Sequence, residues 1–187
     1  MRTRLAALLV VPPLVAAVFG TLCALGYLLV LAFGLPPRLG LPTWLRLAGV
    51  IVLGAGFGLF GWLRAYRGPV DLLVSTYLTF AKAVQGMSPS EPAGRTESLV
   101  IVGPHRCVRH PLYAAIIVLV AGWWLVLDYT FLLFAAGLLA LWFNFVVAPF
   151  EERELHALFG PEYRAYAGRT PRLLPSLRGG RSGSTSR

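Results

Sequence analysis

The chain has 187 residues, of which 57% are hydrophobic and only 13% charged, whereas soluble domains are roughly a quarter charged, so an ordinary water-soluble domain is excluded. At about 20 apolar residues per spanning helix, there is room for a few membrane spans but not for a separate soluble catalytic domain. The net charge of +9 comes from arginines that flank apolar segments rather than interleave with aromatic residues, which argues against nucleic-acid binding.

The first two apolar runs each predict a spanning helix. In the first, residues 5–35, Pro12 and Pro13 would kink or start a helix, so residues 11–33 form the expected spanning core. A cleaved signal peptide is the alternative, disfavoured by the length of the run and the lack of a clear cleavage site. The second run, residues 45–62, carries small residues that let membrane helices approach closely: Gly49, Gly54, Gly56, Gly58 and Gly61.

The middle of the chain predicts one short helix and one helical hairpin. Residues 70–84 contain two charged side chains and are too short for a confident span, so we expect them to lie in the membrane interface or to re-enter. Pro and Gly residues mark residues 85–98 as a polar loop. Residues 112–150 are apolar except for Asp128 and Asn144, which predicts a hairpin of two membrane helices turning near Asp128.

The C-terminal part predicts an amphipathic helix beside the membrane. It begins near Glu151, and its apolar residues recur on one helical face: Leu155, Leu158, Phe159, Tyr163 and Tyr166. Residues 176–187 are rich in Gly, Ser and Arg and are expected to form a disordered basic tail. The expected organisation is therefore one membrane domain, residues 1–175, followed by that tail.

The positive charges predict the topology. If four segments span and residues 70–84 do not, 15 of the 17 lysines and arginines lie on one side, and only Arg38 and Arg46 lie on the other. Positive residues favour the cytoplasmic side, so both termini and the loop before the hairpin should be cytoplasmic. The expected fold is an all-α integral membrane protein of four transmembrane helices plus a short interfacial or re-entrant segment.

The residues that begin the hairpin concentrate polar chemistry. Pro111 suits the first helical turn, which puts His110 at the helix N-cap and Tyr113 one turn inside. Free backbone amides there, together with Arg109, would favour a bound carboxylate or phosphate. The alternative is that the arginines only anchor the helix at lipid headgroups, but this gives no reason for the two histidines and Tyr113.

The far end of the hairpin carries Glu151 and Glu152. Because the hairpin leaves and returns to the same face, we expect His110 and Glu151 to lie close together, with carboxylates and cationic donors around an apolar cleft. Such a site suits a zwitterionic ligand with a purine and a ribose. The glutamates could instead simply favour a helix start, and His156 is expected to be a solvated histidine. His105 and His110 have no companions at metal-ligand spacing, and neither do Cys23 and Cys107, so no metal site is expected.

An ordered series of motifs gives a resemblance to a known family. The chain resembles the isoprenylcysteine carboxyl methyltransferase and phospholipid methyltransferase superfamily over about half its length. The matching residues are Leu99-Val100, Gly103-Pro104, Arg109-His110-Pro111-x-Tyr113, Glu151-Glu152-x-x-Leu155, Phe159-Gly160-x-x-Tyr163-x-x-Tyr166 and Pro171-Arg172 through Pro175.

The resemblance implies S-adenosyl-L-methionine as cofactor, held by residues around both ends of the hairpin. These are Glu97, Ser98, Leu99, Val100, His105, His110, Pro111, Leu112, Tyr113 and Glu151, with Leu99 and Val100 offering apolar packing to the adenine. Glu152 and Arg109 are neighbours of these residues, and we include them because of their charged side chains. Glu152 is a candidate for cofactor binding and Arg109 for catalysis. His110 and Tyr113 are the other candidates for the catalytic set, as residues that orient the reactants.

Two positions depart from the family pattern. His105 stands where the family commonly has tyrosine. Residues 147–150 lack the arginine that eukaryotic prenylcysteine enzymes carry shortly before the paired glutamates, so the prenylcysteine substrate is not carried over. The acceptor stays open between a prenylcysteine-like carboxylate, which needs no general base, and a phospholipid-like amine, which needs one.

The sequence as a whole predicts S-adenosylmethionine-dependent methyl transfer to a lipophilic acceptor at the cytoplasmic face of the cell (inner) membrane. The expected partners are the bilayer and a lipophilic small molecule or lipid, with no nucleic acid and no obligate protein partner. The alternatives are a transporter component and an anchor that binds anionic lipid. A transporter would more naturally show inverted repeats or ionisable residues at mid-membrane.

Overall fold

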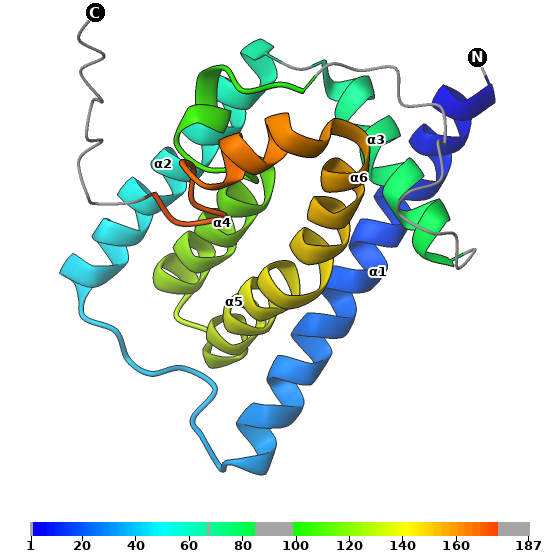
Figure 1. Cartoon of the computed structure of the whole chain (residues 1–187). Coiled ribbons are helices and arrows are strands. Elements are labelled where there is room, and N and C mark those ends of the chain that lie inside the picture. The colour runs from blue at the N-terminus through cyan, green and yellow to red at the C-terminus, as the bar shows by residue number, and fades with distance from the viewer. Residues whose placement is uncertain (1, 67, 85–98, 176–187) are drawn as a thin grey trace, which may run out of the picture.

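The computed structural model describes residues 2–66, 68–84 and 99–175, and these residues form helices joined by short loops (Figure 1). In chain order the helices are α1 (Arg2–Ala32), α2 (Thr43–Tyr66), α3 (Pro69–Val84), the 3₁₀ turn η1 (Gly103–Arg106), α4 (Pro111–Leu127), α5 (Thr130–Trp142), the π-helical turn η2 (Phe143–Val147) and α6 (Ala148–Ala167). No strand occurs in these three ranges, and the expected all-α class is confirmed for them.

Among the described residues, three helices are long and apolar enough to cross a membrane, which indicates a membrane protein. They are Arg4–Ala32 within α1, Thr43–Tyr66, and the continuous helix Thr130–Ala167. Large apolar side chains on their outer faces are exposed, as expected where hydrocarbon replaces water. α1 begins at Arg2, so Pro12 and Pro13 do not start the helix but lie inside it. A helix in lipid tolerates proline because nearby groups can satisfy the freed backbone carbonyls.

The hairpin expected for residues 112–150 is confirmed as α4 and α5. The turn consists of Asp128 and Tyr129, and Asp128 adopts the left-handed conformation (φ 59°) that short polar side chains tolerate. α4 has 17 residues and rises roughly 26 Å, somewhat less than the roughly 30 Å of a hydrocarbon core. Residues 70–84 also form a helix, the 16-residue α3, which packs against α1.

The long helices pack as a row in the order α2, α4, α5, α1 (Figure 1). Close approach of the helices within this row depends on glycine. This confirms the prediction for two of the five glycines singled out in α2, Gly49 and Gly56. A Cβ on Gly49 would lie 2.6 Å from Leu125 Cβ, and one on Gly56 would lie 2.8 Å from Leu119 Cγ. Gly54, Gly58 and Gly61 face open space, so they are not the residues that bring the helices together.

The end of the row that holds the hairpin turn is tied to the α1–α2 loop. Both carboxylate oxygens of Asp128 accept backbone hydrogen bonds, from Leu39, Gly40 and Leu41 at 3.3, 2.9 and 3.0 Å. The Thr130 hydroxyl donates to the Pro36 carbonyl at 2.6 Å. Asp128 is 6% exposed, so this buried carboxylate is held by the loop amides that donate to it.

At the opposite end, the second arm of the hairpin continues directly into α6. The helical segment Thr130–Ala167 changes direction at Gly160, and the part before this bend alone rises roughly 45 Å, which exceeds one bilayer core, so the apolar part up to Phe150 can span while the polar part from Glu151 lies outside. The amphipathic helix therefore begins earlier than expected, at Ala148, and it bends at Gly160 (φ 49°). Because of this bend, Tyr163 and Tyr166 do not continue the helical face of Leu155 and Leu158. Both tyrosines are buried.

Candidate functional site

The site begins at the N-terminus of α4, where His110 is the N-cap residue and Pro111 is the first helical residue, as predicted. His110 is 6% exposed. The segment that follows α6 crosses this turn: the amide of Arg109 donates to the Pro171 carbonyl at 2.8 Å, and the amide of His110 donates to the Arg172 carbonyl at 3.1 Å. Two backbone amides at this turn are thus already paired and are not free to bind an anion.

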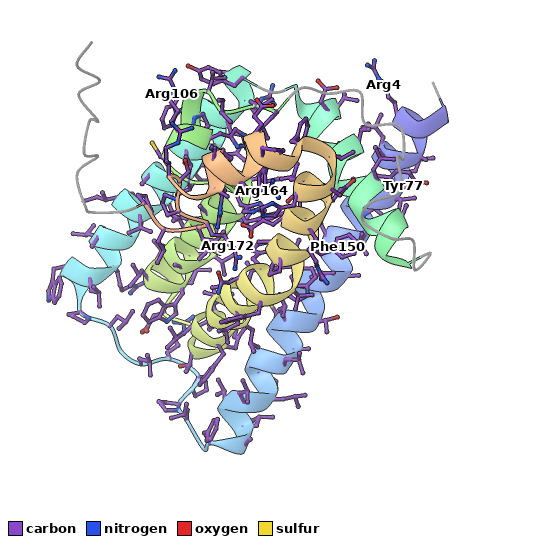
Figure 2. The ribbon with its side chains drawn as sticks, in the orientation of Figure 1. Arg4, Tyr77, Arg106, Phe150, Arg164 and Arg172 are labelled. Carbon is purple, nitrogen blue, oxygen red and sulfur yellow. The ribbon has the colours of Figure 1, made fainter. Side chains whose placement is uncertain are left out.

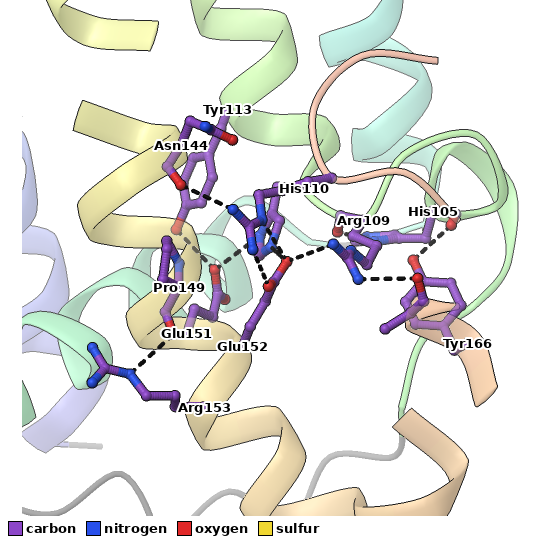
Figure 3. A network of polar contacts seen from close by, with 12 residues as sticks. His105, Arg109, His110, Tyr113, Asn144, Pro149, Glu151, Glu152, Arg153 and Tyr166 are labelled. Carbon is purple, nitrogen blue, oxygen red and sulfur yellow. Dashed lines mark hydrogen bonds and ion pairs between the residues drawn. The ribbon is translucent and has the colours of Figure 1, made fainter. Parts of the chain in front are cut away.

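His110 lies between the two glutamates of α6 (Figure 3). Its Nδ1 lies 3.2 Å from Glu151 Oε2, and its Nε2 lies 3.2 Å from Glu152 Oε1. The expected proximity of His110 and Glu151 is therefore confirmed. Ionised carboxylates only accept hydrogen bonds, so this placement favours the protonated ring, in which both nitrogens donate. Burial lowers the pKa of His110, but the bonds to Glu151 and Glu152 outweigh it and raise the pKa above its ordinary value.

Tyr113, which lies one turn inside α4, also contacts the carboxylate of Glu151. Its hydroxyl donates to Glu151 Oε2 at 2.9 Å. Its ring stacks on the His110 ring at 5.3 Å and on the Phe143 ring at 4.5 Å between centroids. Phe143 belongs to the apolar core cluster of α4, α5 and Leu173, so the polar network is supported directly by the packed hairpin.

Glu152 is the most heavily paired carboxylate of the network. Besides His110, it accepts two bonds from Arg172, from Nε at 3.0 Å and from Nη2 at 2.7 Å, and it lies 3.2 Å from Arg109 Nη2. Burial raises the pKa of Glu152, but the hydrogen bonds from His110 and Arg172 and the nearby charge of Arg109 lower it to about 2. Glu152 is therefore ionised at neutral pH.

A second group of contacts joins the loop before α4 to the end of α6. Arg109 Nη1 donates to the Ala167 carbonyl at 3.1 Å, and the Tyr166 hydroxyl donates to the His105 carbonyl at 2.7 Å. His105 Nδ1 lies 3.3 Å from the Arg109 carbonyl, so His105 lies beside the network rather than against its carboxylates. Figure 3 also shows Arg153 reaching away from the network, to the Pro149 carbonyl.

The structure brings together five of the residues singled out from the sequence: Arg109, His110, Tyr113, Glu151 and Glu152. Pro111 is buried beneath them, and Leu112, Leu99 and Val100 are half-buried. Glu97 and Ser98 lie outside the described residues. The sequence reasoning did not include Asn144 or Tyr166 in the site, and it named Arg172 only as one of three arginines, with Arg106 and Arg109, that could replace the one missing before Glu151. Only the Pro171-Arg172 motif gave a signal that could have pointed to Arg172.

The network combines three cations, His110, Arg109 and Arg172, with two carboxylates, Glu151 and Glu152. With His110 protonated and both glutamates ionised, these five groups carry one net positive charge, which favours an anionic group on a ligand. In residues 2–66, 68–84 and 99–175, no three histidine, cysteine or acidic side chains are grouped so that they could hold a metal ion. Comparison of the chain with protein-family models, curated proteins and solved structures found no match.

Proposed function

We propose that the protein is an integral membrane methyltransferase that transfers a methyl group from S-adenosylmethionine to a lipophilic acceptor. The observation that carries the proposal is the meeting of the turn at residues 110–113 with Glu151 and Glu152 in one buried network at the end of an apolar hairpin. The same two groups of residues carry the resemblance to the isoprenylcysteine carboxyl methyltransferase and phospholipid methyltransferase superfamily.

The chemistry of the network fits S-adenosylmethionine. Glu151 and Glu152 can accept hydrogen bonds from ribose hydroxyls or an amino group, while the surplus cationic charge can bind a carboxylate. When bound, the cofactor supplies a methyl group activated by a sulfonium. Transfer of such a group depends on alignment and exclusion of water, so the residues need to bind and orient rather than to form a covalent intermediate.

In this proposal His110 acts as a fixed hydrogen-bond donor. Both ring nitrogens donate to carboxylates, so His110 orients Glu151 and Glu152 and does not take a proton from the acceptor. Tyr113 orients Glu151 in the same way, and Arg109 holds Glu152. A carboxylate acceptor would need no base, whereas an amine acceptor would need one other than His110.

We further propose that α4 is a fourth spanning helix and that the network faces the cytoplasm of a cell (inner) membrane. The apolar surface of α4 and its position between α2 and α5 support the fourth span. Figure 2 supports the orientation, because Arg4, Arg106 and Arg164 lie toward the end of the row that carries the network. Arg38 bonds Tyr129 at the hairpin turn, at the other end.

Titration calorimetry of the purified protein in detergent with S-adenosylhomocysteine tests the proposal. We expect saturable binding, weakened about ten- to a hundredfold by Glu151→Gln, because one charge-assisted contact contributes about 1.5–3 kcal/mol. Glu162→Gln, at an exposed position of α6, is the matched control and should bind like the unsubstituted protein. Absence of saturable binding would refute the proposal and favour a transporter component or a lipid anchor.

A further inference from the structure

Arg172 contacts several separate parts of the network. Its Nε and Nη2 both donate to Glu152, at 3.0 and 2.7 Å, while its Nη1 donates to the Asn144 carbonyl at 3.1 Å. Its own carbonyl accepts the His110 amide. One residue thus contacts the start of α4, Glu152 of α6 and the π turn η2.

The contact with Asn144 is explained by the π-helical turn η2. In a regular α-helix the Ala148 amide would donate to the carbonyl four residues earlier, which is Asn144. Here it donates to the Phe143 carbonyl instead, as the wider π turn requires. The Asn144 carbonyl thereby loses its usual helical donor, and the Arg172 guanidinium supplies a replacement.

The π turn also sets the direction of the glutamates. It inserts one extra residue between α5 and α6, which rotates the following residues by roughly 100° about the helix axis. Glu151 and Glu152 come directly after this turn and face His110 and Tyr113. Arg172 therefore contacts both the turn that aims the glutamates and one of the glutamates themselves.

We propose that Arg172 is a positioning residue, which holds Glu152 and the π turn in place and thereby fixes the orientation of His110 and the glutamates without contacting the ligand. The inference rests on the proposed function, because it concerns the geometry of the same site. Three of its five N–H donors already bond protein oxygens, and these bonds fix the guanidinium between Glu152 and the π turn. In this proposal Arg172 does not replace the carboxylate-binding arginine that is missing before Glu151.

Calorimetric titration with S-adenosylhomocysteine in detergent tests this role in a set of variants. Arg172→Gln should weaken binding about tenfold, and Arg172→Lys, which keeps the charge but loses the paired geometry, by less. Arg169→Gln is the matched control: Arg169 lies three residues earlier, is exposed, and its side chain donates to the Ala165 carbonyl. It should bind within twofold of the unsubstituted protein.

A double-mutant cycle separates positioning from direct contact. If Arg172 acts through Glu152, then Arg172→Gln should change affinity less than twofold in a Glu152→Gln background. A full tenfold effect in that background would show that Arg172 does not act through Glu152 and would overturn the inference. Equal affinities for Arg172→Gln and Arg169→Gln would overturn it as well.

Folding and the proposed function are controlled separately. If Arg172→Gln does not fold, as judged by thermal melting, Arg172→Lys decides: reduced affinity at unchanged melting temperature supports positioning, and unchanged affinity overturns it. Failure of the unsubstituted protein to bind S-adenosylhomocysteine would refute the proposed function itself. Binding by that protein, with no change in the Arg172 variants, would overturn only the role of Arg172.

Discussion

His110 lies between two carboxylates, each within hydrogen-bond distance of one of its ring nitrogens. These contacts fix the orientation of the ring and raise the pKa of His110, whereas His156 lies on the exposed side of α6. At the residue scale, the site is therefore a set of paired charges rather than an acid–base couple. The stability that these pairs contribute should therefore be lost both at high pH, where His110 loses its proton, and at low pH, where Glu152 gains one.

The pH dependence of stability tests this pairing. The pKa of His110 is raised, so its contribution is complete below its ordinary value of 6.5 and is lost as pH rises through the raised pKa. The pKa of Glu152 is lowered to about 2, so its contribution is complete above 4.5 and is lost as pH falls toward 2. Thermal melting in detergent should show the largest destabilisation by His110→Gln between these limits. His156→Gln is the control, and an equal, pH-independent effect of both substitutions would contradict the pairing.

Sequence reasoning reached His110, Glu151 and Tyr113 because a hairpin returns its ends to one face. The sequence did not predict the role of the Asn144 carbonyl, because a π turn adds a single residue inside an apolar run and does not change the hydropathy pattern. It also did not assign Arg172 to the site. A residue that reaches the network through an irregular segment after α6 cannot be placed by helical periodicity.

At the element scale, the helices are held together by two different devices. Near the hairpin turn a buried carboxylate binds the α1–α2 loop, and along the row glycines allow close backbone contact. The sequence predicted the turn and the role of glycine. It could not tell which glycines face a neighbour, because that depends on the rotation of each helix about its own axis.

Asp128→Ala should destabilise the fold without touching the network. Three loop amides lose their acceptor, which should cost about 1.5–3 kcal/mol. Thermal melting in detergent measures the effect, with Asp71→Ala at an exposed position as control. Affinity for S-adenosylhomocysteine should be unchanged, since Asp128 lies at the opposite end of the row. Equal melting of the two variants would show that the carboxylate does not hold the loop.

Gly26→Ala tests the close contact between α1 and α5. A Cβ at this position would lie 2.5 Å from the Phe131 carbonyl oxygen and 3.2 Å from the Ala135 amide nitrogen, both backbone atoms that cannot move aside easily. We expect a loss of about 1–3 kcal/mol. Gly20→Ala, in the same helix but facing open space, should be neutral or slightly stabilising. The contact is unimportant if both variants melt at the same temperature.

At the scale of the whole molecule, the two ends of the helix row differ in chemistry. One end carries the paired charges, α6 and most of the basic residues, and the other carries the Asp128 turn with Arg38 and Arg46. Hydropathy and charge counts were enough to predict this polarity. They could not decide how α3 meets the membrane, because 16 moderately apolar residues suit several arrangements.

Labelling in intact cells tests the proposed orientation. Cys107 is exposed at the network end, and Leu39 is exposed in the α1–α2 loop. With Cys23 replaced by Ser, an impermeant maleimide should leave Cys107 unlabelled until the cells are opened. A Leu39→Cys variant that also lacks Cys107 should react from outside. Reaction of Cys107 in intact cells would reverse the proposed topology.

Methyl transfer itself is the most direct test of the proposed function. Purified protein in lipid vesicles, supplied with methyl-labelled S-adenosylmethionine and a membrane lipid extract, should transfer label into the organic-soluble fraction. The transfer should fall steeply with Glu151→Gln, which breaks the contact to His110 and Tyr113, and should persist with Glu162→Gln. Absence of label from the organic fraction, label only in added soluble protein, or equal transfer by both variants would contradict the proposed activity or its site.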